Sequence, residues 1–176
     1  MRSRLTALAA CLPLALAPAH ADVVDRIAAA VNNRAIKESQ IDRDIRLTDF
    51  LNGVPLDESA ASKRKAADRL IDQTVIRTEL AKGTYPAPSD ADVTATLEKI
   101  KQARFRSDAD YQQALKTYGI SEPELKAQIA FQLQVVKFVD LRFAKGSLKA
   151  DNDAFFAWLD ATRKASRIQY HDEVLQ

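Results

Sequence analysis

The fold is decided by residues 25–42, which read DRIAAAVNNRAIKESQID. Three residues of this segment alternate onto one face: Ile27, Ala29 and Val31. Such alternation predicts a short strand. The pair Asn32-Asn33 favours the left-handed conformations of a type I′ turn, and Ser39 with Asp42 makes a Ser-x-x-acid box that predicts a capped helix start. A strand, a tight turn and a helix therefore follow one another within one short segment.

The residues before this segment have the form of a secretory signal. Arg2 and Arg4 precede an apolar run, residues 5–17. Ala19-His20-Ala21 then has the small-x-small arrangement of a cleavage site. We therefore expect export to the periplasm.

The expected boundaries are a signal peptide at residues 1–21, cleaved after Ala21, and a single domain at residues 22–176. Lipoprotein processing at Cys11 is the alternative. It is disfavoured because only about six apolar residues precede that cysteine, fewer than the roughly 7–15 of a signal core. No later stretch approaches the run of about 20 apolar residues that a transmembrane helix needs.

Composition excludes several classes of function. The formal net charge of +2 comes from the basic residues of the signal, so the domain is near neutral and carries no nucleic-acid footprint. Beyond the signal there is no cysteine and one histidine, His171. Pairs of carboxylates fall in predicted first helical turns, where the helix dipole explains them. We therefore expect no catalytic residue, no metal site and no cofactor.

The remaining pattern predicts a mainly α fold with about six helices. Three further Ser-x-x-acid boxes predict helix starts, and they begin at Ser89, Ser107 and Ser121. Three glycines lie where the apolar periodicity stops and predict helix ends: Gly83, Gly119 and Gly146. The fourth, Gly53, lies in a turn. The predicted helices span residues 39–51, 58–82, 90–104, 108–118, 122–145 and 151–165.

The end of the chain predicts a small β element. Ile168 and Tyr170 alternate as in a half-buried strand. A lone strand leaves its backbone groups unpaired, so we expect this strand to pair with residues 27–31. The C-terminal helix and strand, residues 151–171, would then close onto the N-terminal part of the domain.

The fifth predicted helix is apolar over much of its circumference. Such a helix is either the buried centre of a bundle or the carrier of an exposed apolar strip that receives a partner. The sequence leaves both open.

Several segments resemble SurA-like periplasmic chaperones, the group that includes the PrsA and PpiD foldases. The resemblance begins in residues 25–42 and continues in residues 69–76, 118–121, 125–129, 158–163 and 168–170. Family members usually insert parvulin prolyl-isomerase domains between positions that match Arg142 and Asn152, where this chain has a short linker. The resemblance thus implies a complete chaperone module that is not an enzyme.

The implied function is that of an ATP-independent holdase. It would capture unfolded exported proteins, chiefly outer-membrane β-barrel precursors, in an apolar crevice between helices with low selectivity. Candidate client-binding residues are Phe50, Leu51, Val54, Tyr111, Tyr118, Phe131, Phe138 and Phe156, any of which could instead be core.

Two other functions stay open. The first is a dedicated envelope assembly or docking partner, which could form a homodimer by exchanging terminal strands. The second is a peptidyl-prolyl isomerase by family label, although no parvulin domain is visible.

Overall fold

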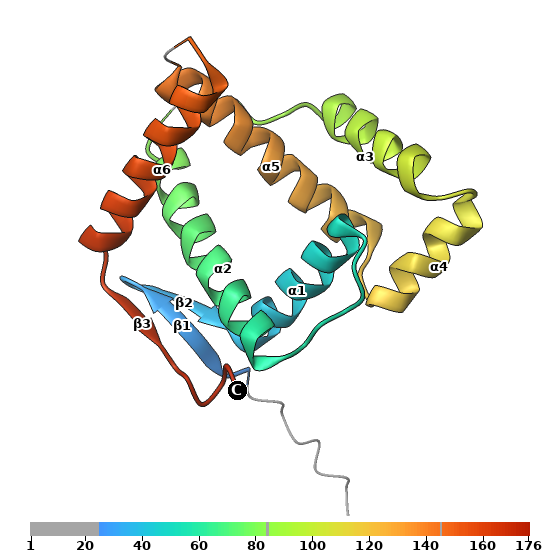
Figure 1. Cartoon of the computed structure of the whole chain (residues 1–176), viewed down its shortest axis with the longest axis horizontal. Helices are drawn as coiled ribbons and strands as arrows, with labels where there is room; N and C mark the ends of the chain where they lie inside the picture. The colour runs from blue at the N-terminus through green and yellow to red at the C-terminus, as the bar shows by residue number, and fades with distance from the viewer. Residues whose placement is uncertain (1–24, 84, 145) are drawn as a thin grey trace, which may run out of the picture.

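The computed structural model describes residues 25–83, 85–144 and 146–176. In these ranges it contains six helices and one three-stranded antiparallel sheet (Figure 1), which confirms the mainly α fold. The predicted signal peptide lies outside the described residues. The helices are α1 (Glu38–Asn52), α2 (Ala60–Leu80), α3 (Asp90–Arg104), α4 (Asp108–Tyr118), α5 (Glu122–Phe143) and α6 (Leu148–Ala165).

The sheet joins the two ends of the described chain. β1 (Ile27–Val31) is its central strand and pairs with β2 (Arg34–Lys37) on one side and β3 (Ile168–Tyr170) on the other. Val31 lies opposite Ile168, and Ala29 lies opposite Tyr170. The predicted pairing of the terminal strands is therefore confirmed, whereas β2 was not predicted as a separate strand.

The hairpin turn differs from the predicted type. Among the described residues other than glycine, Asn32 alone has a positive φ, at 54°. A type I′ turn needs positive φ at both central residues, so the assignment of Asn32-Asn33 to that type was wrong. Asn32 also binds the C-terminal segment: its N–H donates to the Arg167 carbonyl at 2.8 Å, and its Oδ1 accepts from the Arg167 N–H at 2.9 Å. The turn thus helps to hold β3 in place.

One residue of β1 is not on the predicted buried face. The register shifts between Ile27 and Ala29, so the alternation is interrupted there. As a result Ala28 and Ala29 are both fully buried, while Ile27 is 46% exposed.

Helix starts agree with three of the four predicted boxes. Ser89, Ser107 and Ser121 each accept a backbone N–H of the first turn. The first box was wrong, because α1 already begins at Glu38. Ser39 instead donates its hydroxyl to Asp25 at 2.7 Å and ties the start of the described chain to α1.

Helix ends show further differences. Gly119 has a left-handed conformation and ends α4 as predicted, and Gly53 ends α1 in the same way. Gly83 lies beyond the end of α2 and is not left-handed. The last helix starts three residues earlier than predicted because Ser147 caps it.

The described residues form two hydrophobic cores. The larger one, hereafter the sheet core, joins the sheet to α2, α6, the start of α1 and the end of α5. The smaller one joins the end of α1 to α3, α4 and the start of α5, hereafter the α3–α4 core. Figure 1 shows α3 and α4 on the opposite side of the molecule from the sheet. Helices α1 and α5 belong to both cores and connect them.

A charged cluster fastens α6 to α2. Arg163 of α6 donates to Asp72 at 2.5 Å and to Asp68 at 3.2 Å, one helical turn apart on α2. The Tyr170 hydroxyl of β3 also donates to Asp68, at 2.5 Å. Because β3 and α6 meet the same carboxylate, pairing of the sheet and docking of α6 reinforce each other.

Replacing Val31 by Asp should unfold the domain. Val31 is 3% exposed, so a carboxylate there loses apolar burial and is taken out of water, which costs about 4 kcal/mol or more. The matched control is Ile27→Asp on the same strand, which should cost less than about 1 kcal/mol because Ile27 is half-exposed. Thermal unfolding followed by circular dichroism measures both. Equal melting temperatures for Val31→Asp and the wild type would contradict the pairing of β1 with the C-terminal strand.

Candidate functional site

An open crevice lies between the two cores. It has a volume of about 500 Å³ and is lined by residues of α1, α2, α5 and α6. The size falls in the range of ordinary ligand pockets. All four helices contribute side chains, and α6 completes the crevice with Phe155 and Leu159.

One wall of the crevice is apolar and comes from the second half of the chain. Its residues are Phe131, Val135 and Val136 of α5 with Phe155 and Leu159 of α6. Ile76 of α2 continues the wall at its base. Val136 is 57% exposed, whereas Phe155 and Leu159 are almost buried. The wall thus has one exposed aliphatic side chain, Val136, next to tightly packed residues such as Phe155.

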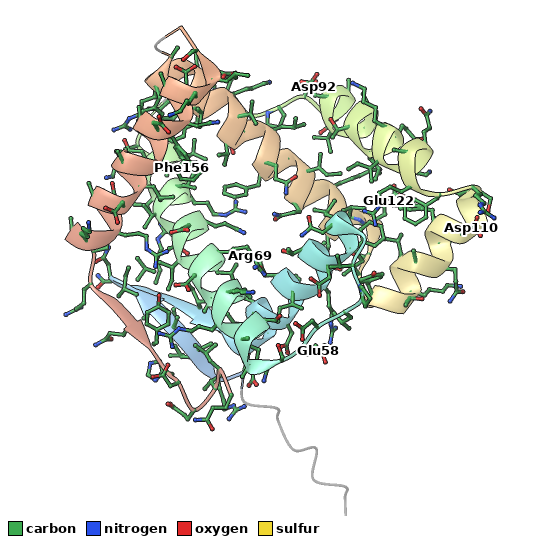
Figure 2. The ribbon with its side chains drawn as sticks, viewed as in Figure 1. Glu58, Arg69, Asp92, Asp110, Glu122 and Phe156 are labelled. Carbon is green, nitrogen blue, oxygen red and sulfur yellow. The ribbon has the colours of Figure 1, made fainter. Side chains whose placement is uncertain are left out.

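The opposite side of the crevice carries a buried ion pair. Asp44 of α1 is 6% exposed and accepts from Arg69 Nε of α2 at 2.8 Å through Oδ2. Its other oxygen accepts from Gln73 Nε2 at 3.2 Å. Figure 2 shows Arg69 directed from α2 toward α1. Burial raises the pKa of Asp44, and Arg69 and Gln73 oppose that effect by binding the charged form.

Four further polar side chains of the crevice have no hydrogen-bond partner within the described residues: Thr48, Asn52, Gln128 and Gln132. Amides and hydroxyls can both donate and accept. An extended peptide presents unpaired N–H and C=O groups and needs such partners when it leaves water. The crevice therefore combines apolar surface with groups that can pair with a peptide backbone.

The structure brings two of the predicted client-binding residues to the crevice. Leu51 and Phe131 line it. Phe156 lies beside it on α6, labelled in Figure 2, with its ring 5.3 Å from that of Phe155, and it is 61% exposed. Phe156 therefore extends the apolar wall beyond the crevice.

Three predicted client-binding residues are core residues instead. Phe50, Tyr111 and Phe138 have no exposed surface, so they cannot contact a client in this conformation. Phe50 and Tyr111 pack edge to face in the α3–α4 core, with ring centroids 6.4 Å apart. Phe138 packs against four aromatic rings around the end of α5, those of Tyr85, Phe143, Phe155 and Trp158. Helical periodicity alone does not separate such residues from surface aromatics.

The last two predicted residues lie away from the crevice. Val54 is 43% exposed in the loop after α1. Tyr118 is half-buried, stacks edge to face on Phe50 and donates its hydroxyl to the Val54 carbonyl at 2.7 Å. This pair closes the loop over the α3–α4 core.

The sequence reasoning missed most of the crevice. A signal was present in α5, where Gln128, Gln132 and Val136 recur every four residues and so share one helix face. Two glutamines in the most apolar helix of the chain mark a face that is not core. Asp44 and Arg69 carried no such signal, because their contact depends on how α1 packs on α2.

The described part of the chain contains no cluster of His, Cys, Asp or Glu that could hold a metal ion. None of its helices combines the length and hydropathy needed to cross a membrane.

The fold and the crevice define a small helical module, closed by a terminal sheet, with an open cleft of mixed apolar and amide character. Comparison with protein families identifies the module. The chain belongs to the SurA-like N-terminal domain family, whose model matches residues 16–139. The match ends within α5, so α6 and β3 lie beyond it.

Two curated relatives are both named Chaperone SurA. The protein of Saccharophagus degradans is 30% identical over 113 residues, which cover 62% of this chain and 26% of the relative. The protein of Pseudomonas aeruginosa is 27% identical over 132 residues, covering 72% of this chain and 31% of the relative. The chain thus spans less than a third of the length of either relative.

The raised pKa of Asp44 predicts a particular pH dependence. The folded chain holds this proton more tightly than the unfolded chain. The resulting stabilisation is fully present below the ordinary aspartate pKa of about 3.9 and is lost as pH rises through the raised value. Asn at this position can still accept from Arg69 but does not titrate. Urea unfolding from about pH 3 to about pH 6 should therefore show the free energy of unfolding of the wild type falling relative to that of Asp44→Asn. The prediction would be contradicted if the free energy of unfolding of the wild type, relative to that of Asp44→Asn, stayed constant or rose over this pH range.

Proposed function

We propose that the domain is an ATP-independent holdase of the periplasm, which binds unfolded exported proteins in the crevice and keeps them from aggregating. The observation that carries the proposal is the open crevice, whose apolar wall runs outward to Val136 and Phe156. Exposed apolar surface of this kind marks an interaction site in a small domain. Membership in the SurA-like family and relatives named as chaperones support the same role.

The apolar wall suits the segments that aggregate most readily. Outer-membrane β-barrel precursors expose strands in which aromatic and aliphatic residues alternate with polar ones. One side chain from such a strand, buried against Phe131 or Val135, contributes about 2 kcal/mol. One or two such anchors give weak and reversible capture, which lets a client leave without ATP.

The polar side of the crevice complements the apolar wall. The unpaired groups of Asn52, Gln128 and Gln132 can bond the main chain of a bound strand, whatever its sequence. We infer from this that the crevice recognises extended backbone as well as apolar side chains. The sequence alone did not identify polar groups that could recognise a client.

Light scattering of a denatured outer-membrane β-barrel protein tests the proposal. The protein is diluted from denaturant with and without an equimolar amount of the chaperone domain. We expect the domain to slow aggregation several-fold without ATP. Unchanged aggregation would contradict the holdase function, and tight binding to one envelope protein alone would favour a dedicated docking partner.

Two variants of α5 localise the activity. Val136→Glu places a charge on the crevice wall at a residue that is 57% exposed, so it should abolish most of the protection while leaving the melting temperature nearly unchanged. Leu141→Glu is the matched control, because Leu141 is 64% exposed on the same helix but does not line the crevice. Equal protection by both variants would place client binding elsewhere.

A further inference from the structure

A second cavity lies between the sheet and α2. It has a volume of about 510 Å³ and is lined by β2, by Gln40 of α1 and by one face of α2. β2 is an edge strand of the sheet, since the strand order is β2-β1-β3. One side of β2 therefore carries no partner strand within the described chain. The crevice lies on another face of α2, and the two sites share Gln73.

The cavity contains two arginines and no acidic residue. Arg34 comes from β2 and Arg77 from α2. Neither forms an ion pair or a hydrogen bond with a carboxylate in the described part of the chain. Most other described arginines do, including Arg26, Arg43, Arg46, Arg64, Arg69, Arg142 and Arg163. The cavity thus has an excess of positive charge that the protein itself does not neutralise.

Arg77 is exposed to solvent on one side and covered by an aromatic ring on the other. Its guanidinium group lies 3.8 Å from the centroid of the Phe131 ring, which replaces water on that side. Loss of hydration lowers the pKa of Arg77, and no neighbouring acid counteracts the effect. An anion placed on the open side of the group would supply the missing partner.

The other polar side chains of the cavity each make one hydrogen bond within the described chain. Gln73 donates to Asp44 at 3.2 Å, and the Thr74 hydroxyl donates to the Leu70 carbonyl at 2.7 Å. Gln40 accepts from the Lys37 N–H at 2.9 Å. The two guanidinium groups are thus the charged donors left for a ligand. Beside them, Ile36 and Leu70 give the cavity an apolar part.

We propose that this cavity binds the C-terminal carboxylate of a peptide whose last residue is apolar. A chain end joins a carboxylate and an apolar side chain on one carbon atom, which matches guanidinium groups set beside Ile36 and Leu70. An internal Asp or Glu cannot offer both from the same residue. Arginine binds carboxylates in planar, paired geometry, and the free edge of β2 can bond the peptide main chain. This site lies on another face of α2 than the crevice, although Gln73 lines both, and it does not depend on the proposed holdase function.

Fluorescence anisotropy with labelled hexapeptides tests the proposal. Two peptides share one sequence ending in Leu; the first has a free C-terminal carboxylate and the second a C-terminal amide. We expect the acid to bind about tenfold more tightly, the gain typical of a charge-assisted hydrogen bond. Equal affinities would overturn the proposal. A third peptide, amidated but with an internal Asp, tests the source of the carboxylate; affinity equal to that of the acid would overturn the assignment to a chain end.

Variants locate the site. Arg34→Gln and Arg77→Gln should each bring the acid close to the affinity of the amide. Arg34 is exposed and unpaired, so its loss should not affect folding, and circular dichroism checks both variants. Arg106→Gln is the matched control, an exposed arginine outside the cavity, and should keep the tenfold difference. Val136→Glu should keep it too, which separates this site from the crevice. If both Arg34→Gln and Arg77→Gln still bound the acid about tenfold more tightly than the amide, the proposal would be overturned.

Discussion

The pairing of β1 with β3 is the constraint on which the rest of the structure depends. It joins residues 27–31 to residues 168–170, and the turn residue Asn32 adds two hydrogen bonds to Arg167. The same pairing brings Tyr170 to Asp68, the carboxylate that also binds Arg163 of α6. Closing the sheet and docking α6 therefore reinforce each other. Without the pairing of β1 with β3, only the contacts with the end of α5 and with α2 would hold α6 in place.

The crevice is a consequence of that closure. α1 and α5 each contribute to both hydrophobic cores, and the crevice lies where the two cores meet. α6 supplies Phe155 and Leu159 to its apolar wall. The crevice thus arises from packing between elements that are far apart in sequence.

The sequence predicted the fold better than the site. Capping serines such as Ser121 act within their own helix turn, so the helix starts could be predicted. The strand that contains Ile168 and Tyr170 could be predicted to pair with residues 27–31, which form the other predicted strand. Ser39 was misread because Asp25, distant in sequence, takes its hydroxyl. Whether Phe50, Tyr111 and Phe138 are core or surface could not be decided from the sequence, because burial of an aromatic residue depends on the neighbouring helices, which periodicity does not specify. The pair of Asp44 and Arg69 was likewise invisible before α1 and α2 were placed.

The most direct test of the account removes residues 167–176, and with them β3, and follows the single tryptophan. Trp158 lies on α6, with its ring 5.4 Å from that of Phe138, so its emission reports whether α6 is docked. We predict that the shortened chain has red-shifted emission and loses its protection of unfolded clients. Unchanged emission together with full protection would show that the crevice does not depend on the terminal strand.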